Sequence, residues 1–194
     1  DSSAIVDSLE IKLVKFSNAT AGLAYVNRGT VDNVNVKCDN LEADVGLVYR
    51  NEGTIRQSSF EGFFGGYGRF GPRGGGLVYI NEGTISECYV NADVERDMPY
   101  VIAGFAVENH GTIENSFSVG DVLGMNDSAY SAVYLNTGVI SKSYSVGKGY
   151  RAFAYENKGS IENSYALKTR YFVEQSDNGK LVNGTNYHTS QEAT

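Results

Sequence analysis

The sequence predicts an all-β chain that folds as a parallel β-solenoid of about six to seven coils. Three observations lead to this prediction: a fifteen-residue phrase recurs along the chain, each copy reads as strand, turn and strand, and no helical periodicity separates the copies. The clearest copy spans Gly76 to Val90. A unit that repeats every ~20 to 30 residues is the signature of a repeat architecture, in which each copy stacks on the next. Further copies contain Asn27, Asn51, Asn109, Asn136 and Asn157, and a degenerate copy surrounds Asp177.

The composition agrees with a β-rich fold. Of the 194 residues, 41% are hydrophobic, and the chain contains 23 Gly, 14 Tyr, 2 Pro and no Trp. Such a chain is too apolar and too aromatic to be disordered, and abundant Gly beside Val, Ile, Tyr and Thr favours strands and tight turns over helices. Because the repeat runs almost end to end, we expect one continuous domain instead of two.

The charge balance restricts the possible partners. The formal net charge is −7, from 16 basic and 23 acidic residues, which argues against nucleic acid or an anionic membrane as a partner. No stretch approaches the ~18 apolar residues of a membrane-spanning helix. The start, Asp1 to Ala4, lacks the charged region and apolar core of a signal peptide, so we expect a mature product or a fragment of a longer protein.

The chain divides into a cap, a repeat region and a tail. Residues 1–21 precede the first clear copy, and their alternating stretch Ile11 to Phe16 predicts a strand of an atypical N-terminal capping coil. Residues 22–187 hold the repeats as one solenoid, with a possible last coil around Tyr171 to Val173. Residues 188–194 are polar, and we expect a tail.

Aligning the copies on their Asn produces columns that predict the first strand of each coil. Residues four and two positions before the Asn are apolar or aromatic, while the position directly before it tolerates charge. This alternation predicts a strand whose Leu and Tyr columns pack inward with the core. The inward columns are Leu23, Leu47, Leu77, Phe105, Ala132 and Phe153, then Tyr25, Tyr49, Tyr79, Val107, Tyr134 and Tyr155.

The rest of the phrase predicts a turn and a second strand. Asn-x-Gly is turn chemistry, because Gly reaches positive φ and the Asn side chain bonds to nearby backbone. An apolar column four residues after the Asn, typified by Ile85, is expected in the core. A column of small residues three positions further on, typified by Cys88 and Ser116, indicates a site where backbones crowd or turn. Aromatic residues follow it at Tyr89, Phe117, Tyr144 and Tyr165.

Stacking of identical positions at about 4.8 Å would form a rod on the order of 30 Å long. Each Asn amide is both donor and acceptor, so we expect the Asn column to form a structural hydrogen-bond ladder. We expect Cys38 and Cys88 to be unpaired thiols, since they occupy different repeat positions and form no disulfide or metal pattern.

Length variation falls in one connection of the repeat. Between successive phrases lie 9, 15, 13, 12, 6 and 5 residues, so the insertions should emerge along one edge and form the binding face. The longest insertion, residues 61–75, combines aromatic and Arg side chains among glycines, which suit contacts with sugar rings or a protein partner. A lid that packs over the solenoid is the alternative. The candidate ligand-binding residues are Phe63, Phe64, Tyr67, Arg69, Phe70, Arg73 and, in the next insertion, Tyr100.

The phrase G-L-x-Y-x-N-x-G-T-I-x-x-S-Y resembles the GLUG repeat of bacterial surface and secreted proteins. Residues 46–60, 76–90, 104–120 and 152–166 carry the resemblance, with Gly22 to Val31 matching in part. The main departure is Tyr, as at Tyr79, where that family commonly has its second Gly. The resemblance implies a right-handed parallel β-solenoid on large extracellular proteins, such as adhesins and regions flanking immunoglobulin-cutting proteases. It carries no catalytic residues and implies no cofactor.

Residues that could perform chemistry are few. His110 lies at the variable turn position and is expected to be exposed, and His188 lies in the tail. Glu95 with Asp97 is the minimum a glycosidase needs, and Asp93 with Asp97, or Asp121 with Asp127, could hold Ca²⁺. Solvent-facing charge is the simpler interpretation of these pairs. We therefore predict no catalytic residue and no metal site.

We expect a non-catalytic extracellular module that serves as a stiff spacer and adhesion platform of a bacterial or phage surface protein. Its partner would be a host or environmental glycan or protein, bound through the variable edge, with no membrane insertion and as part of a larger surface assembly. One alternative is a solenoid-type carbohydrate-active enzyme, a polysaccharide lyase or hydrolase with its site over the long insertions. Another is a non-catalytic segment of a secreted protease.

Overall fold

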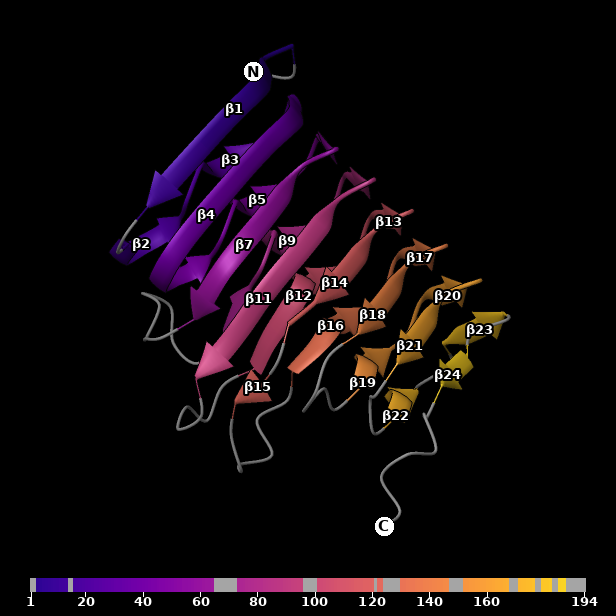
Figure 1. The fold of residues 1–194 in the computed structure, drawn as a ribbon. Coiled ribbons are helices and arrows are strands. Elements are labelled where there is room, and N and C mark those ends of the chain that lie inside the picture. The colour runs from indigo at the N-terminus through magenta and orange to yellow at the C-terminus, as the bar shows by residue number, and fades with distance from the viewer. Residues whose placement is uncertain are drawn as a thin grey trace.

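The computed structural model describes residues 3–13, 16–64, 73–95, 101–120, 122–123, 130–146, 152–167, 171–176, 179–182 and 185–187. Every regular element in these ranges is a β-strand, and the strands pair in parallel with the equivalent strands of the coils before and after (Figure 1). The predicted all-β parallel solenoid is therefore confirmed. Residues 188–194, the predicted tail, lie outside the described residues.

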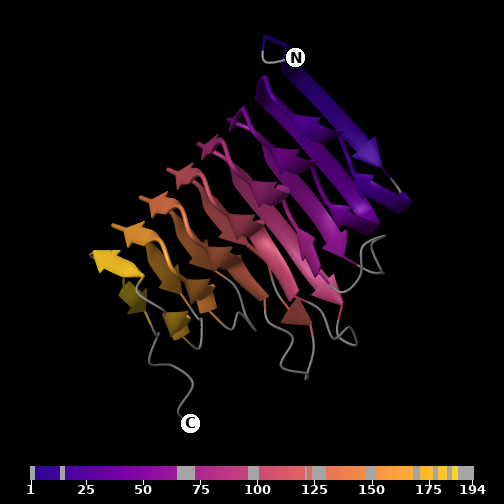
Figure 2. The same ribbon diagram turned by 180° about the vertical axis from the view of Figure 1, so that it is seen from behind.

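Three faces make up each coil. Face A holds the strands that end at the repeat Asn, face B the strands after the Asn-x-Gly turn, and face C the strands after the next corner. Figure 2 shows the same succession of strands from behind. Face A consists of β3 (Ala24–Asn27), β5 (Val48–Asn51), β9 (Val78–Asn81), β12 (Val101–Asn109), β16 (Tyr130–Asn136), β19 (Ala152–Asn157) and β22 (Tyr171–Ser176).

Two long strands, β1 (Ile5–Leu13) and β4 (Thr30–Val45), each run through face B into face C. The other face B strands are β6 (Thr54–Arg56), β10 (Thr84–Ser86), β13 (Thr112–Glu114), β17 (Val139–Ser141), β20 (Ser160–Glu162) and β23 (Lys180–Val182). The other face C strands are β7 (Ser59–Phe64), β11 (Tyr89–Glu95), β14 (Phe117–Val119), β18 (Tyr144–Val146), β21 (Tyr165–Leu167) and β24 (Thr185–Tyr187). Three further strands border the connection from face C to face A: β2 (Phe16–Ala21), β8 (Arg73–Gly75) and β15 (Val122–Leu123).

The apolar column of face B forms the centre of the core. Ile85 lies beside Ile55 on one side and Ile113 on the other, and all three side chains are fully buried. The column confirms the expected in-register stack. It is eight strands deep, from Val6 in β1 to Leu181 in β23, so the coil count differs from the expected six to seven. The extra levels come from the first and last coils, whose sequences diverge most from the phrase.

The Asn column forms a continuous buried ladder. Each Nδ2 donates to the Oδ1 of the next Asn at 2.7–2.8 Å, from Asn27 through Asn157. The ladder ends at Asn157, which pairs in register with Ser176 and whose Nδ2 has no hydrogen-bond partner within the described residues. The prediction that the last copy is aligned on Asp177 is thus wrong by one residue on face A. It is confirmed on face B, where Leu181, four residues after Asp177, lies beside Ile161.

Face A departs from the predicted alternation. Leu47 is buried as expected, but Val48 is buried as well, and the Tyr column faces outward. Tyr25, Tyr49 and Tyr79 stack on the outer surface with ring centroids 4.9 and 5.0 Å apart. The chain bends at Gly46, where a Cβ would approach Gly76 O to 2.3 Å. Leu47 at the bend and Val48 after it both point inward, so the Tyr that follows lies outside, not in the core. The side chain after the Tyr is partly exposed as well, as at Arg50, and this agrees with the predicted tolerance of charge at that position.

The corner between faces B and C contains a left-handed residue in each of the seven coils where the structure describes it. Their φ values lie between 48° and 55° although none is Gly, and the small residue that follows is buried in the interior coils. Ser116 is typical: its Oγ donates to Glu114 O at 2.8 Å and accepts the backbone N–H of Cys88 at 3.1 Å. The small column is thus a second ladder at a backbone turn. The left-handed residues are Ser8, Asn33, Gln57, Glu87, Asn115, Lys142 and Asn163.

Connections of variable length all run from face C to face A, for example from Phe64 to Arg73 and from Glu95 to Val101. From the coil of Asn27 to that of Asn157, the expectation that length variation is confined to one connection is confirmed. In the last coil the turn from Ser176 to Lys180 is one residue longer than its counterpart from Asn157 to Ser160. The longest insertion is not all loop, however. β7 continues to Phe64 because residues 61–64 pair with Asn91 to Val94 of β11, and β8 begins at Arg73.

Candidate binding surface

The structure describes part of the predicted binding set. Phe63 and Phe64 lie at the end of β7, beside Asp93 and Val94 of β11, and Arg73 begins β8. The structure therefore places Phe63 and Phe64 on face C of the solenoid body. The other four predicted residues, Tyr67, Arg69, Phe70 and Tyr100, lie outside the described residues.

A shallow groove of about 380 Å³ crosses the outer surface of face C next to this insertion. We call it the face C groove. It is contributed by β4, β7 and β11 of three consecutive coils, and Phe63 is the predicted site residue among those that line it. Its polar and aromatic lining comprises Lys37, Asp39, Glu61, Phe63, Asn91 and Asp93.

The groove residues form two rows because they occupy two outward-facing positions of the repeat. Lys37, Glu61 and Asn91 are paired in register as one row. In the second row, Phe63 is paired with Asp93, and Asp39 lies at the corresponding sequence position of the preceding coil. Extending the repeat columns to ten and twelve residues after the Asn would have identified both rows from sequence.

The groove has an excess of negative charge. It contains three carboxylates, on Asp39, Glu61 and Asp93, against one ammonium group on Lys37. Lys37 Nζ lies 3.2 Å from Glu61 Oε2, and both side chains are more than a third exposed, so this pair adds little stability. Anionic ligands are disfavoured by this balance, whereas uncharged hydroxyl groups find acceptors along both rows.

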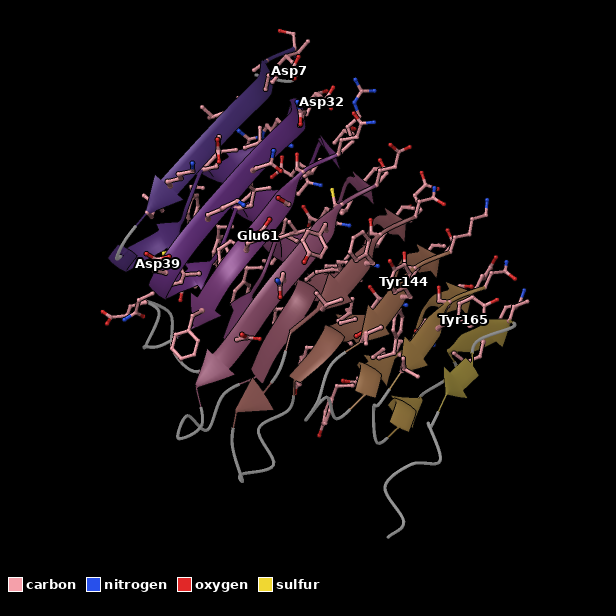
Figure 3. The ribbon with its side chains drawn as sticks, viewed as in Figure 1. Asp7, Asp32, Asp39, Glu61, Tyr144 and Tyr165 are labelled. Carbon is pink, nitrogen blue, oxygen red and sulfur yellow. The ribbon has the colours of Figure 1, made fainter. Side chains whose placement is uncertain are left out.

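An aromatic ladder continues along face C from the groove. Tyr89 lies two residues before Asn91 on β11, its ring centroid is 4.4 Å from that of Phe117, and Phe117 is 5.1 Å from Tyr144. Tyr144 and Tyr165 are 43% and 42% exposed. Figure 3 views this face, with Asp39 and Glu61 over the earlier coils and Tyr144 and Tyr165 farther along the stack.

Stacking determines what the ladder offers to a ligand. The Phe117 and Tyr144 rings are nearly parallel, with 4° between their planes, so their faces cover each other and their edges point outward. Desolvation by burial, with a Coulombic contribution from Glu61, raises the pKa of the Tyr89 hydroxyl above its ordinary value. That hydroxyl therefore remains a neutral hydrogen-bond donor and acceptor at physiological pH.

The histidine prediction is confirmed for His110, which is exposed at the Asn-x-Gly turn. Its Nδ1 lies 2.6 Å from Thr137 Oγ1, and its Nε2 lies 3.4 Å from Glu108 Oε2. His188, Asp97, Asp121 and Asp127 lie outside the described residues, as does the side chain of Glu95.

Within the described ranges, no group of three or more His, Cys, Asp or Glu side chains is arranged to hold a metal ion. In the same ranges no helix is long and apolar enough to cross a membrane. Cys38 and Cys88 are both buried, and they form no disulfide. Desolvation by burial raises the pKa of Cys88 to about 12, although hydrogen bonds with the backbone of Ser58 and Ser86 oppose the shift.

Comparisons of the chain with protein-family models, with curated proteins and with solved structures find no match. The fold and its surface define a parallel β-solenoid that displays a groove and an aromatic ladder on one face.

Proposed function

We propose that this chain is a non-catalytic module of an extracellular bacterial or phage surface protein, in which it serves as a stiff spacer and binding platform. The single observation that carries the proposal is the continuous outer surface of face C. There, a groove across three coils passes directly into an aromatic ladder that extends over the following coils. The resemblance of the phrase to GLUG repeats supports the same role.

The spacer role is supported by the connections between coils. Each step along face A from Asn27 to Asn157 carries an Asn-to-Asn hydrogen bond, and backbone bonds such as Glu82 N–H to Asn51 O at 2.8 Å add to it. The Ser ladder adds a buried bond at the opposite corner, such as Ser116 N–H to Ser143 Oγ at 3.2 Å. Buried polar networks whose members are satisfied rigidify a structure, so the coils should move as one body.

The surface chemistry supports a hydroxyl-rich ligand, and we propose a neutral glycan. The carboxylates of Asp39 and Asp93 accept hydrogen bonds from sugar hydroxyls, and the amide of Asn91 can both donate and accept them. Phe63 lies between the two carboxylates and offers apolar surface to the C–H groups of a sugar ring. The excess negative charge disfavours sialylated or sulfated glycans.

A glycan array with the full chain tests this function. We expect binding to neutral glycans without release of cleaved product. The double variant Phe63→Ala/Asp93→Asn should bind at least about tenfold more weakly, because an aromatic contact and a hydrogen bond together contribute roughly 2 kcal/mol. The control variant Tyr25→Ala removes an exposed aromatic side chain of face A and should bind as the unmodified chain does.

Two results would overturn the proposal. Cleavage of a bound polysaccharide would favour the carbohydrate-active enzyme. Binding that is lost in Tyr25→Ala but kept in the double variant would move the ligand site away from face C.

A further inference from the structure

The N-terminal end of the solenoid exposes an apolar surface. Within the described residues, β1 pairs with β4 alone, so its other edge is open. Ile5, Val6 and Leu9 of β1 are 71%, 37% and 38% exposed, although Val31 and Val34 directly behind Val6 and Leu9 are buried. A hollow of about 190 Å³ beside Val6 extends this surface over Leu23 and Ala24 of face A.

The C-terminal end exposes the other end of the same core column. Leu181 of β23 is 46% exposed, whereas Ile161, one coil inward, is fully buried. Within the described part of the chain, β23 pairs with β20 alone. Each end of the stack therefore presents the last side chain of one apolar column, together with an open strand edge. Open edges of this kind are templates for pairing with another chain.

Side-chain orientation counts against one symmetric pairing of the N-terminal edge. Val6 and Leu9 align with buried residues of β4, whereas Asp7 and Glu10 align with Asp32 and Asn35 on its outer surface. Ser8 lies at the corner between them, with φ 55°. Two copies of β1 related by a two-fold axis through Ser8 would place Asp7 opposite Leu9 and Val6 opposite Glu10. Such a pair would set charged groups against core groups.

Parallel pairing with the C-terminal edge avoids this conflict. If β23 of one molecule continues the stack over β1 of another in the register that the coils already use, Leu181 covers Val6. Lys180 then lies over Ile5, and Val182 lies over Asp7, so no like charges meet. This contact repeats the geometry of the seven steps that join the eight strands of the column within one molecule.

We propose that the two ends of this solenoid bind each other between molecules, so that copies of the chain associate head-to-tail through β1 of one and β23 of the next. Head-to-tail contacts use two different surfaces and need not close into a ring. Association therefore extends the rod along its axis and keeps face C of every copy on the outside, independently of whether face C binds a glycan.

Sedimentation velocity over a range of concentrations tests the proposal with the full chain. We expect the unmodified chain to form species larger than a monomer as concentration rises. Val6→Lys and Leu181→Lys each place a charge in one end of the column and should each be monomeric throughout. Val139→Lys is the matched control, because Val139 is 40% exposed on the side of the rod, and it should associate as the unmodified chain does.

Mixing the two end variants separates this arrangement from a symmetric dimer. Val6→Lys keeps an intact C-terminal end and Leu181→Lys keeps an intact N-terminal end, so a one-to-one mixture should form a dimer and nothing larger. Far-ultraviolet circular dichroism of each variant confirms that it is folded before mixing. The proposal is overturned if the unmodified chain stays monomeric, if either end variant associates alone, or if two folded variants fail to associate when mixed.

Discussion

At the residue scale, stability depends on side chains that bond along the axis of the solenoid. Asn81 is fully buried, accepts from Asn51 Nδ2 at 2.8 Å and donates to Asn109 Oδ1 at 2.8 Å. Changing Asn81 to Ala leaves a donor on Asn51 and an acceptor on Asn109 without that partner. Asn51 Nδ2 keeps bonds of 3.3 Å to the carbonyls of Gly53 and Thr84, whereas Asn109 Oδ1 loses its amide donor. A buried polar group left unsatisfied costs about 1–3 kcal/mol, so we expect the free energy of unfolding in urea to fall by about that amount.

The matched control is Asn91→Ala, which removes an exposed Asn from the same coil. It should change the free energy of unfolding by less than about 0.5 kcal/mol. Equal effects of the two substitutions would show that the buried ladder adds no stability beyond that of a surface Asn.

Cys88 replaces the Ser of the second ladder, and its burial makes stability depend on pH. The pKa of its thiol is raised from 9.0 to about 12 in the folded chain. Below pH 9 the thiol is protonated in both states, and above it the unfolded state gains stability by losing the proton. The contribution of Cys88 is therefore full below pH 9 and is lost as pH rises toward 12.

Comparison with Cys88→Ser isolates this effect from the titration of Tyr and Lys. The unmodified chain should lose up to about 1.4 kcal/mol more than the variant for each pH unit between 9 and 12. Urea unfolding at several pH values measures the difference. If the free energies of unfolding of the two proteins changed by the same amount with pH, the raised pKa of Cys88 would be contradicted.

At the scale of elements, the phrase predicts one corner of each coil well and the other poorly. Asn-x-Gly marks the turn from face A to face B by composition alone. The corner from face B to face C requires a left-handed residue, yet Gln57, Glu87 and Lys142 occupy it without glycine. In the sequence, the signal for this corner was the column of small residues that directly follows the left-handed position. The outward Tyr column was missed because the bend at Gly46 shifts the alternation by one residue, which a strict period of two does not anticipate.

The left-handed corner leads to a prediction at Lys142, whose φ is 48°. A left-handed conformation costs an L-residue about 1–2 kcal/mol, of which Gly recovers part after its greater loss of chain entropy. Lys142→Gly should therefore raise the free energy of unfolding by up to about 1 kcal/mol. Lys142→Val should lower it, because a β-branched residue is disfavoured there.

The control for Lys142 is Lys158→Gly, at an exposed position that is not left-handed. Glycine there should lower stability by increasing the freedom of the unfolded chain. If glycine stabilised the protein at both positions, or at neither, the left-handed conformation assigned to Lys142 alone would be contradicted.

The candidate site was predictable only in part. The aromatic composition of the longest insertion identified Phe63. Glu61 lies on the same strand, and the remaining polar groove residues come from the coils on either side. Those residues share a repeat position but not a chemical type: Lys37, Glu61 and Asn91 occupy one row, and Asp39, Phe63 and Asp93 the other. A column that varies in chemistry carries no motif, and its members are brought together only by the stacking.

At the scale of the whole molecule, the geometry of each coil stays constant while the number of residues per coil changes. Successive ladder Asn residues are 24, 30, 28, 27 and 21 positions apart in sequence, yet each step closes the same hydrogen bond. The surplus residues are accommodated in the connection from face C to face A. The rise of the rod per coil should therefore be constant, whatever the length of the insertion.

Distances between spin labels along the Asn-x-Gly turns test this central claim most directly. Arg28, His110, Thr137 and Lys158 are exposed at equivalent turn positions, while Cys38 and Cys88 are buried and should remain unlabelled. With one label at position 28, the distances to labels at 110, 137 and 158 should be about 14, 19 and 24 Å, a constant step of about 4.8 Å per coil. Distances that grow with the number of intervening residues, or that lack a common step, would contradict the stacked solenoid.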